Sequence, residues 1–172
     1  MHSRRTSVAI MVALLVLTVT AIGSPGRAVR AAGPTACTFN MDNAISPGLS
    51  TSPSSGTFTS NGETGTITCD GPVNGKQPSG PGKIGQSGHY QGTCQSGGSG
   101  DFVATLTIPT SSGAQHVTDT GTLTFGGIQG GLFNAQFQGD RMSGTAQVRP
   151  TQGDCVTTPT TKAHETANGT LH

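Results

Sequence analysis

The chain has 172 residues, only 10% of them charged, and a formal net charge of +1. Residues 1–31 hold four of the nine basic residues and none of the eight acidic ones, so the remaining 141 residues carry a net charge of −3. Because binding to nucleic acid or to an anionic membrane surface depends on clustered Lys and Arg, this composition argues against both partners.

Residues 1–31 have the pattern of an export signal, with a basic start at Arg4, an apolar run over 8–22 and small residues before a predicted cleavage site near Ala31. Cleavage after Ala28 is the alternative. The arginine pair at the start leaves the twin-arginine route open, but its context favours the general secretory route. The apolar run is about 15 residues long, short for a membrane-spanning helix, so we expect a secreted protein, extracellular or associated with the cell envelope, without a membrane span.

Residues 32–172 have the length of one domain, but their composition is unusual. Leu, Ile, Val and Phe supply only 21 of these 141 residues, and glycine supplies 25. So few apolar residues leave a disordered chain as an alternative. The low net charge and the regular spacing of the apolar residues favour a folded domain.

The strongest structural signal is strict alternation of apolar and polar residues, as in the segment 102–108, which predicts strands with one buried face. In chain order, the runs typical of strands lie near residues 36–41, 56–60, 64–70, 88–94, 101–108, 114–125, 131–138, 141–149, 153–158 and 161–171. Helical periodicity is missing after residue 31. About eight to ten short antiparallel strands predict an all-β domain, preferably a closed barrel, with a β-sandwich as the alternative.

The segment 71–100 is rich in Gly, Pro and Ser, and we expect it to form a long loop region that includes the short strand run near 88–94. Its stretch Gly80–Gly85 matches the dinucleotide-binding fingerprint. That motif works only between a strand and a helix N-terminus, and no helix fits after it. We therefore predict no cofactor.

Four cysteines in an exported chain indicate two disulfides, for which three pairings are open. Cys69 and Cys94 flank the predicted loop, whereas Cys37 and Cys155 lie in the first and a late strand, which are neighbours in a closed barrel. We therefore predict Cys69–Cys94 and Cys37–Cys155. Neither CxxC nor paired Cys/His spacing occurs, so no metal site is expected.

The sequence contains no recognisable catalytic constellation, and we assign no catalytic residue. His89 and Tyr90 are the candidates for ligand binding, because adjacent strand residues face opposite sides and one of them can enter the barrel. His164 and Glu165 are interpreted as opposite faces of a polar edge strand. The aspartates at strand ends are expected to serve turns, namely Asp101, Asp119, Asp140 and Asp154.

Two resemblances bear on function. The stretches Ser143–Ala146 and Gly153–Pro159 are similar to small secreted actinobacterial Gly/Thr-rich β proteins of unknown function, a likeness that covers the C-terminal third and transfers no functional residue. The predicted barrel resembles, in architecture alone, the allene oxide cyclase and dirigent barrels, which steer small reactive molecules in an apolar cavity. It also resembles the avidin-like barrels, but the tryptophans on which biotin binding depends are missing.

These patterns predict a secreted, non-catalytic barrel module that binds a small ligand or a cell-envelope component. The alternative is a cavity enzyme of the allene oxide cyclase or dirigent type acting on a small apolar substrate. The barrel interior decides where binding can take place. An apolar cavity with one or two inward polar groups favours binding of a ligand or a substrate inside the barrel, whereas a filled core leaves only the loops and the outer face for binding.

Overall fold

The computed structural model describes residues 33–60 and 65–172, and the predicted export signal lies outside these residues. These described residues form one compact unit. Their nine strands are β1 (Thr35–Leu49), β2 (Ser54–Thr59), β3 (Gly65–Cys69), β4 (Gly82–Thr93), β5 (Gly97–Thr110), β6 (Gly113–Phe125), β7 (Phe133–Gly139), β8 (Met142–Gln152) and β9 (Thr160–Leu171). The described part of the chain contains no helix, and so none that could cross a membrane.

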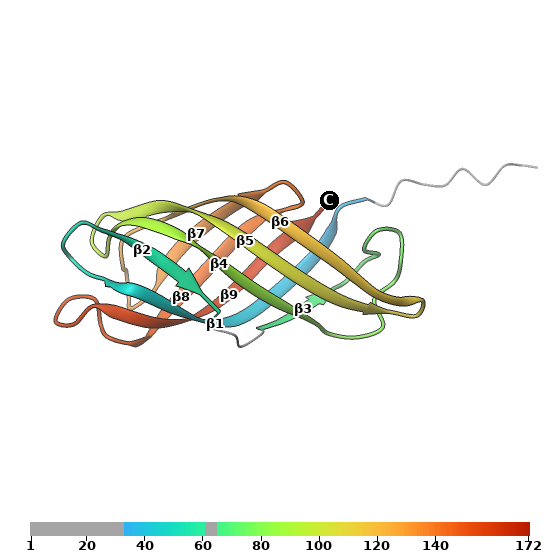
Figure 1. The fold of residues 1–172 in the computed structure, drawn as a ribbon, viewed down its shortest axis with the longest axis horizontal. Coiled ribbons are helices and arrows are strands. Elements are labelled where there is room, and N and C mark those ends of the chain that lie inside the picture. The colour runs from blue at the N-terminus through green and yellow to red at the C-terminus, as the bar shows by residue number, and fades with distance from the viewer. Residues whose placement is uncertain (1–32, 61–64) are drawn as a thin grey trace, which may run out of the picture. The chain divides into compact units, whose positions relative to one another are not determined.

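All nine strands belong to one antiparallel sheet that closes into a barrel (Figure 1). Closure comes from β1 and β9, whose residues pair from Thr35 with Leu171 to Ala44 with Lys162. The predicted all-β barrel is therefore confirmed. Connections of two to four residues join β1 to β2, β4 to β5, β5 to β6 and β7 to β8, and these pairs are hairpins of the kind that alternating sequences favour.

One position in the barrel wall is shared by two strands. The first half of β1 pairs with β3 and its second half pairs with β2, and β4 pairs with the same two strands on the other side. Ser60, which follows β2, extends this wall by donating its backbone N–H to the carbonyl of Gln86 at 2.9 Å. The ring thus has eight strand positions although the sheet has nine strands.

The predicted loop over 71–100 is wrong for most of its length. The strand β4 occupies residues 82–93 and β5 already begins at Gly97, so the long loop is confined to residues 70–81. The glycines of this segment interrupt the alternation of apolar and polar residues from which strands were predicted. Strand β4 carries glycine where it passes close to neighbouring strands: a Cβ on Gly88 would lie 2.6 Å from the ring of Phe58.

The run 153–158 is also not a strand. It is a turn organised by Asp154, whose carboxylate accepts hydrogen bonds from the backbone N–H groups of Val156, Thr157 and Thr158 at 2.8 to 3.0 Å. The hydrogen bond from the Thr157 hydroxyl, together with these backbone bonds, lowers the pKa of Asp154 strongly. The expectation that this aspartate serves a turn is confirmed.

All four cysteines form disulfides, but the predicted pairing is wrong: the bonds are Cys37–Cys69 and Cys94–Cys155. Cys37 and Cys69 face each other on β1 and β3, with Cα atoms 4.1 Å apart. The strand β4 crosses the whole barrel between Cys69 and Cys94, which places these two cysteines at opposite ends. Two disulfides are typical of a protein that folds in an oxidising, extracellular environment.

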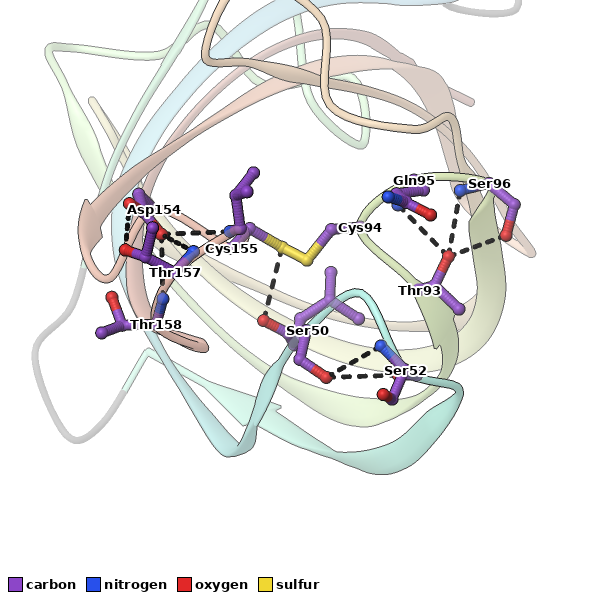
Figure 2. Close-up of a disulfide and its surroundings, with 12 residues drawn as sticks. Ser50, Ser52, Thr93, Cys94, Gln95, Ser96, Asp154, Cys155, Thr157 and Thr158 are labelled. Atoms are coloured by element: carbon purple, nitrogen blue, oxygen red, sulfur yellow. Dashed lines mark hydrogen bonds between the residues drawn. A yellow bond between two sulfur atoms is a disulfide. The ribbon is translucent and has the colours of Figure 1, made fainter.

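The Cys94–Cys155 disulfide crosses one end of the barrel. It joins the β4–β5 turn to the β8–β9 loop, and these connections lie on opposite sides of the ring because they are four strand positions apart. Figure 2 shows the bond between the two loops with the strands around it. Both cysteines are buried, and Cys94 also accepts a hydrogen bond from the backbone N–H of Ile128 at 2.7 Å. This end of the barrel is therefore covered.

Candidate functional site

The barrel interior gathers every aromatic side chain of the protein. The sequence has six phenylalanines, one tyrosine and no tryptophan, and all seven line one cavity: Phe39, Phe58, Tyr90, Phe102, Phe125, Phe133 and Phe137. Alternation along the strands turns them inward, while the outward positions of β6 and β7 are mostly Thr, Asn and Gln. The aromatic groups therefore concentrate on one cavity inside the barrel.

The cavity has a volume of about 120 Å³. Small residues on three adjacent strands keep part of the interior open, with Ala135 on β7, Ala146 on β8 and Ala163 and Ala167 on β9. Protein interiors are normally packed with few voids larger than a water molecule. A dry apolar cavity of about 150 Å³ can hold benzene, so this space suits a small organic molecule rather than a large ligand.

A polar cluster of three side chains from three strands interrupts the apolar lining. Asn43 of β1 donates its Nδ2 to Oε2 of Glu165 on β9 at 2.8 Å. Gln86 of β4 donates its Nε2 to the same Oε2 at 2.6 Å and to Oδ1 of Asn43 at 3.2 Å. Besides the Tyr90 hydroxyl, these are the polar side chains of the described cavity lining.

Glu165 lies deep in the interior, and burial raises the pKa of its carboxyl group, an effect that the hydrogen bonds from Gln86 and Asn43 and the nearby His164 only partly offset. Its residual accessible surface is intermediate because the residue faces the cavity. The described lining includes no Lys, Arg or His. A carboxylate here would have no counter-charge, which favours the neutral acid.

The break between β2 and β3 explains why the amide side chains of Asn43 and Gln86 lie at the same height along the barrel as Glu165. On β1, Asn40 is the last residue paired with β3 and Ala44 is the first paired with β2, and Asn43 falls between them. Gln86 occupies the corresponding gap on β4 and its backbone bonds to Ser60. The amide side chains of Asn43 and Gln86 then turn into the barrel, where both bond to Glu165, which lies on the strand beside Asn43.

The side chains of the two predicted ligand-binding residues lie on opposite faces of the barrel wall. Tyr90 is buried, lines the cavity, and donates its hydroxyl to the backbone carbonyl of Pro47; burial raises the pKa of this hydroxyl. His89 points outward with 73% of its side chain exposed, and its Nδ1 lies 2.9 Å from Oδ1 of Asp101. The hydrogen bond from His89 lowers the pKa of Asp101. Ligand binding by either residue stays a prediction.

Asp101 thus belongs to an outer-face pair in the middle of a sheet, and not to a turn as expected. A second pair of this kind joins Nδ1 of His164 to Oδ1 of Asp42 at 2.8 Å. Both pairs are exposed to solvent. Within residues 33–60 and 65–172, no three His, Cys, Asp or Glu side chains cluster in a way that could hold a metal ion.

Sequence reasoning missed Asn43, Gln86 and Glu165. His164 and Glu165 do face opposite sides of β9, but this strand is no edge, since it pairs with β8 on one side and β1 on the other. A signal was available: Glu165 lies between Ala163 and Ala167 on a face that is otherwise small and apolar. A charged residue in such a row indicates a buried polar group with a functional role rather than a solvent-exposed residue of an edge strand.

Fold and cavity together define a closed antiparallel barrel with a mainly apolar cavity, whose described lining carries one carboxyl group, that of Glu165. Comparison of the chain with protein-family models, with curated proteins and with solved structures finds no match. The function must therefore be inferred from the site.

Proposed function

We propose that this protein is secreted and binds one small, largely apolar molecule inside its barrel. The observation that carries the proposal is the concentration of all seven aromatic side chains on a cavity of about 120 Å³. An empty cavity of this volume costs about 3 kcal/mol at roughly 24 cal/mol per Å³. A larger residue in place of Ala135 would remove this cost, so a cavity kept open is consistent with an occupant.

Secretion is supported by two features. The export pattern in residues 1–31, with cleavage near Ala31, provides a route out of the cell. The disulfides Cys37–Cys69 and Cys94–Cys155 need an oxidising compartment to form and persist. The resemblance to small secreted actinobacterial proteins agrees with both and adds no ligand.

Native mass spectrometry of protein purified from the culture medium of its own host tests the proposal. We expect an adduct of low molecular mass that is lost on denaturation. The cavity-filling variant Ala135→Leu should be recovered without the adduct, whereas the outward neighbour Gln136→Leu should keep it. An adduct retained equally by both variants would place the ligand outside the barrel.

A cavity enzyme is the second candidate, favoured by the buried carboxyl group of Glu165. An acid with a raised pKa in a water-poor site can donate a proton to a bound substrate. Incubation of the recovered ligand with fresh protein distinguishes the two functions. Conversion that is lost in Glu165→Gln indicates an enzyme, and a ligand returned unchanged indicates a binding module.

A further inference from the structure

We propose that Glu165 acts as a hydrogen-bond donor in the cavity and so selects small neutral molecules that carry a carbonyl or ether oxygen on an apolar body. This inference rests on the proposed function and specifies its ligand class. It excludes amines as the preferred ligands and distinguishes oxygen-bearing ligands from pure hydrocarbons.

The hydrogen-bond pattern of the cluster leaves one carboxyl oxygen for a ligand. Both amide donors, from Asn43 and Gln86, go to Oε2 of Glu165. In the described part of the chain, Oε1 has no hydrogen-bond partner and is not enclosed, since the buried side-chain atoms without a partner are Ser54 Oγ and Thr160 Oγ1. Oε1 therefore keeps accessible surface, and Glu165 lines the cavity.

The proton of the neutral acid belongs on this free oxygen, because Oε2 already faces two N–H donors. The assignment of the Gln86 amide supports the pattern: its Nε2 lies against two acceptors, Asn43 Oδ1 and Glu165 Oε2, so a flipped amide would place oxygen against oxygen. Oε1–H can then donate to a ligand acceptor.

The charges around Glu165 support the neutral form. Tyr90 is the other titratable residue of the described lining. Charged and titratable groups on the strands beside Glu165 lie on the outer face, where they alternate with the inward residues: Asp42 on β1, Lys83 and His89 on β4, Arg149 on β8, Lys162 and His164 on β9. None of them offers a counter-charge inside the barrel.

The remaining lining determines the rest of the ligand. Apart from the Tyr90 hydroxyl, which bonds to Pro47, the rest of the described lining is apolar, so a second polar group on the ligand would lose its hydration without a partner. The volume of about 120 Å³ limits the ligand to roughly the size of benzene, which an apolar cavity of about 150 Å³ can hold.

Three probes of equal size test this inference: methylcyclohexane, cyclohexanone and cyclohexylamine. The methyl signals of Met41 and Met142 can detect binding, because both residues line the cavity. The other two of the four methionines, Met1 and Met11, lie outside the described residues. Titration of ¹³C-methyl-methionine protein at several pH values gives an affinity for each probe from the shifts of these two methyl signals.

We expect Glu165→Leu to weaken cyclohexanone roughly tenfold and to leave methylcyclohexane within about threefold, the effect of losing one buried hydrogen bond. Cyclohexanone affinity should fall as pH rises through the raised pKa of Glu165, because the carboxyl group loses the proton that it donates. Glu165→Gln keeps a donor of the same size, so it should retain binding and lose this pH dependence. This variant serves alone if Glu165→Leu does not fold.

Two results would overturn the inference and leave the proposed function intact. One is tighter binding of cyclohexylamine than of cyclohexanone, lost in Glu165→Gln, which would make Glu165 an anionic site. The other is an equal effect of Glu165→Leu on ketone and hydrocarbon. If no probe shifts the signal of Met41 or Met142, the cavity accepts no small molecule, and the proposed function itself fails.

Discussion

Replacement of Phe137 by alanine should destabilise the barrel by about 4 kcal/mol. The ring of Phe137 packs edge to face against Phe39 and Phe102, with centroids 6.2 and 6.3 Å apart. Gly144 and Gly169 lie directly beside it, since a Cβ on either would come within 2.8 and 2.9 Å of Cζ. Because these glycines have no side chains to refill the space, we expect a loss within the usual 3–5 kcal/mol for Phe→Ala.

Thermal denaturation followed by circular dichroism measures this effect. For a domain of this size, a loss of about 4 kcal/mol lowers Tm by roughly 8–16 °C. Gln136→Ala is the matched control, because its side chain is exposed on the same strand and surface changes usually stay within about 0.5 kcal/mol. If the two variants melt at the same temperature, or if Gln136→Ala is the more sensitive, the register of β7 is wrong by one residue.

Three further predictions concern the polar cluster, a disulfide and a turn. Glu165 loses its proton at higher pH in the folded than in the unfolded state. The free energy of unfolding should therefore fall by up to about 1.4 kcal/mol per pH unit as pH rises from about 4.5 through the raised pKa. Urea denaturation of Glu165→Gln should show no such decline, and the same pH profile in the variant and the original protein would contradict the burial of Glu165. Peptide mapping without reduction should link Cys94 to Cys155, and their joint replacement by serine should cost about 2–4 kcal/mol; recovery of a peptide linking Cys94 to any other cysteine would refute the topology. Asp119→Ala should lower the free energy of unfolding by about 1–3 kcal/mol in chemical denaturation, because the buried carboxylate of Asp119 accepts two backbone N–H bonds from the β7–β8 turn at 2.7 and 3.1 Å. Replacement of the exposed Asp140 by alanine should leave the stability unchanged.

Local alternation predicted most of the strands and the faces of their side chains. Phe133 and Leu106 face inward and Gln136 and Thr105 face outward, as the period of two requires. Where this signal is diluted by glycine, as in β4, the prediction failed. A glycine contributes no side chain to the pattern, although it allows the close strand contact that the barrel needs at Gly88.

The disulfide pairing depended on strand direction across the whole barrel, which no spacing in the sequence encodes. The prediction that β1 and β9 are neighbours is confirmed, yet Cys37 lies at the end of β1 that meets the last residues of β9, and Cys155 precedes the first. Positions on neighbouring strands are therefore not enough for two cysteines to form a disulfide. Two cysteines must also lie at the same end, and the crossing of β4 decided this for Cys69 and Cys94.

The sequence by itself determined an all-β chain with a few large side chains on one face, because side-chain direction along a strand depends only on local backbone geometry. Only the tertiary structure decided which of those faces enclose a cavity and which polar groups meet in it. Glu165 is 122 residues from Asn43 and 79 residues from Gln86 along the chain. Barrel closure, a long-range event, brings them together and takes the carboxyl group away from water, and that burial raises its pKa.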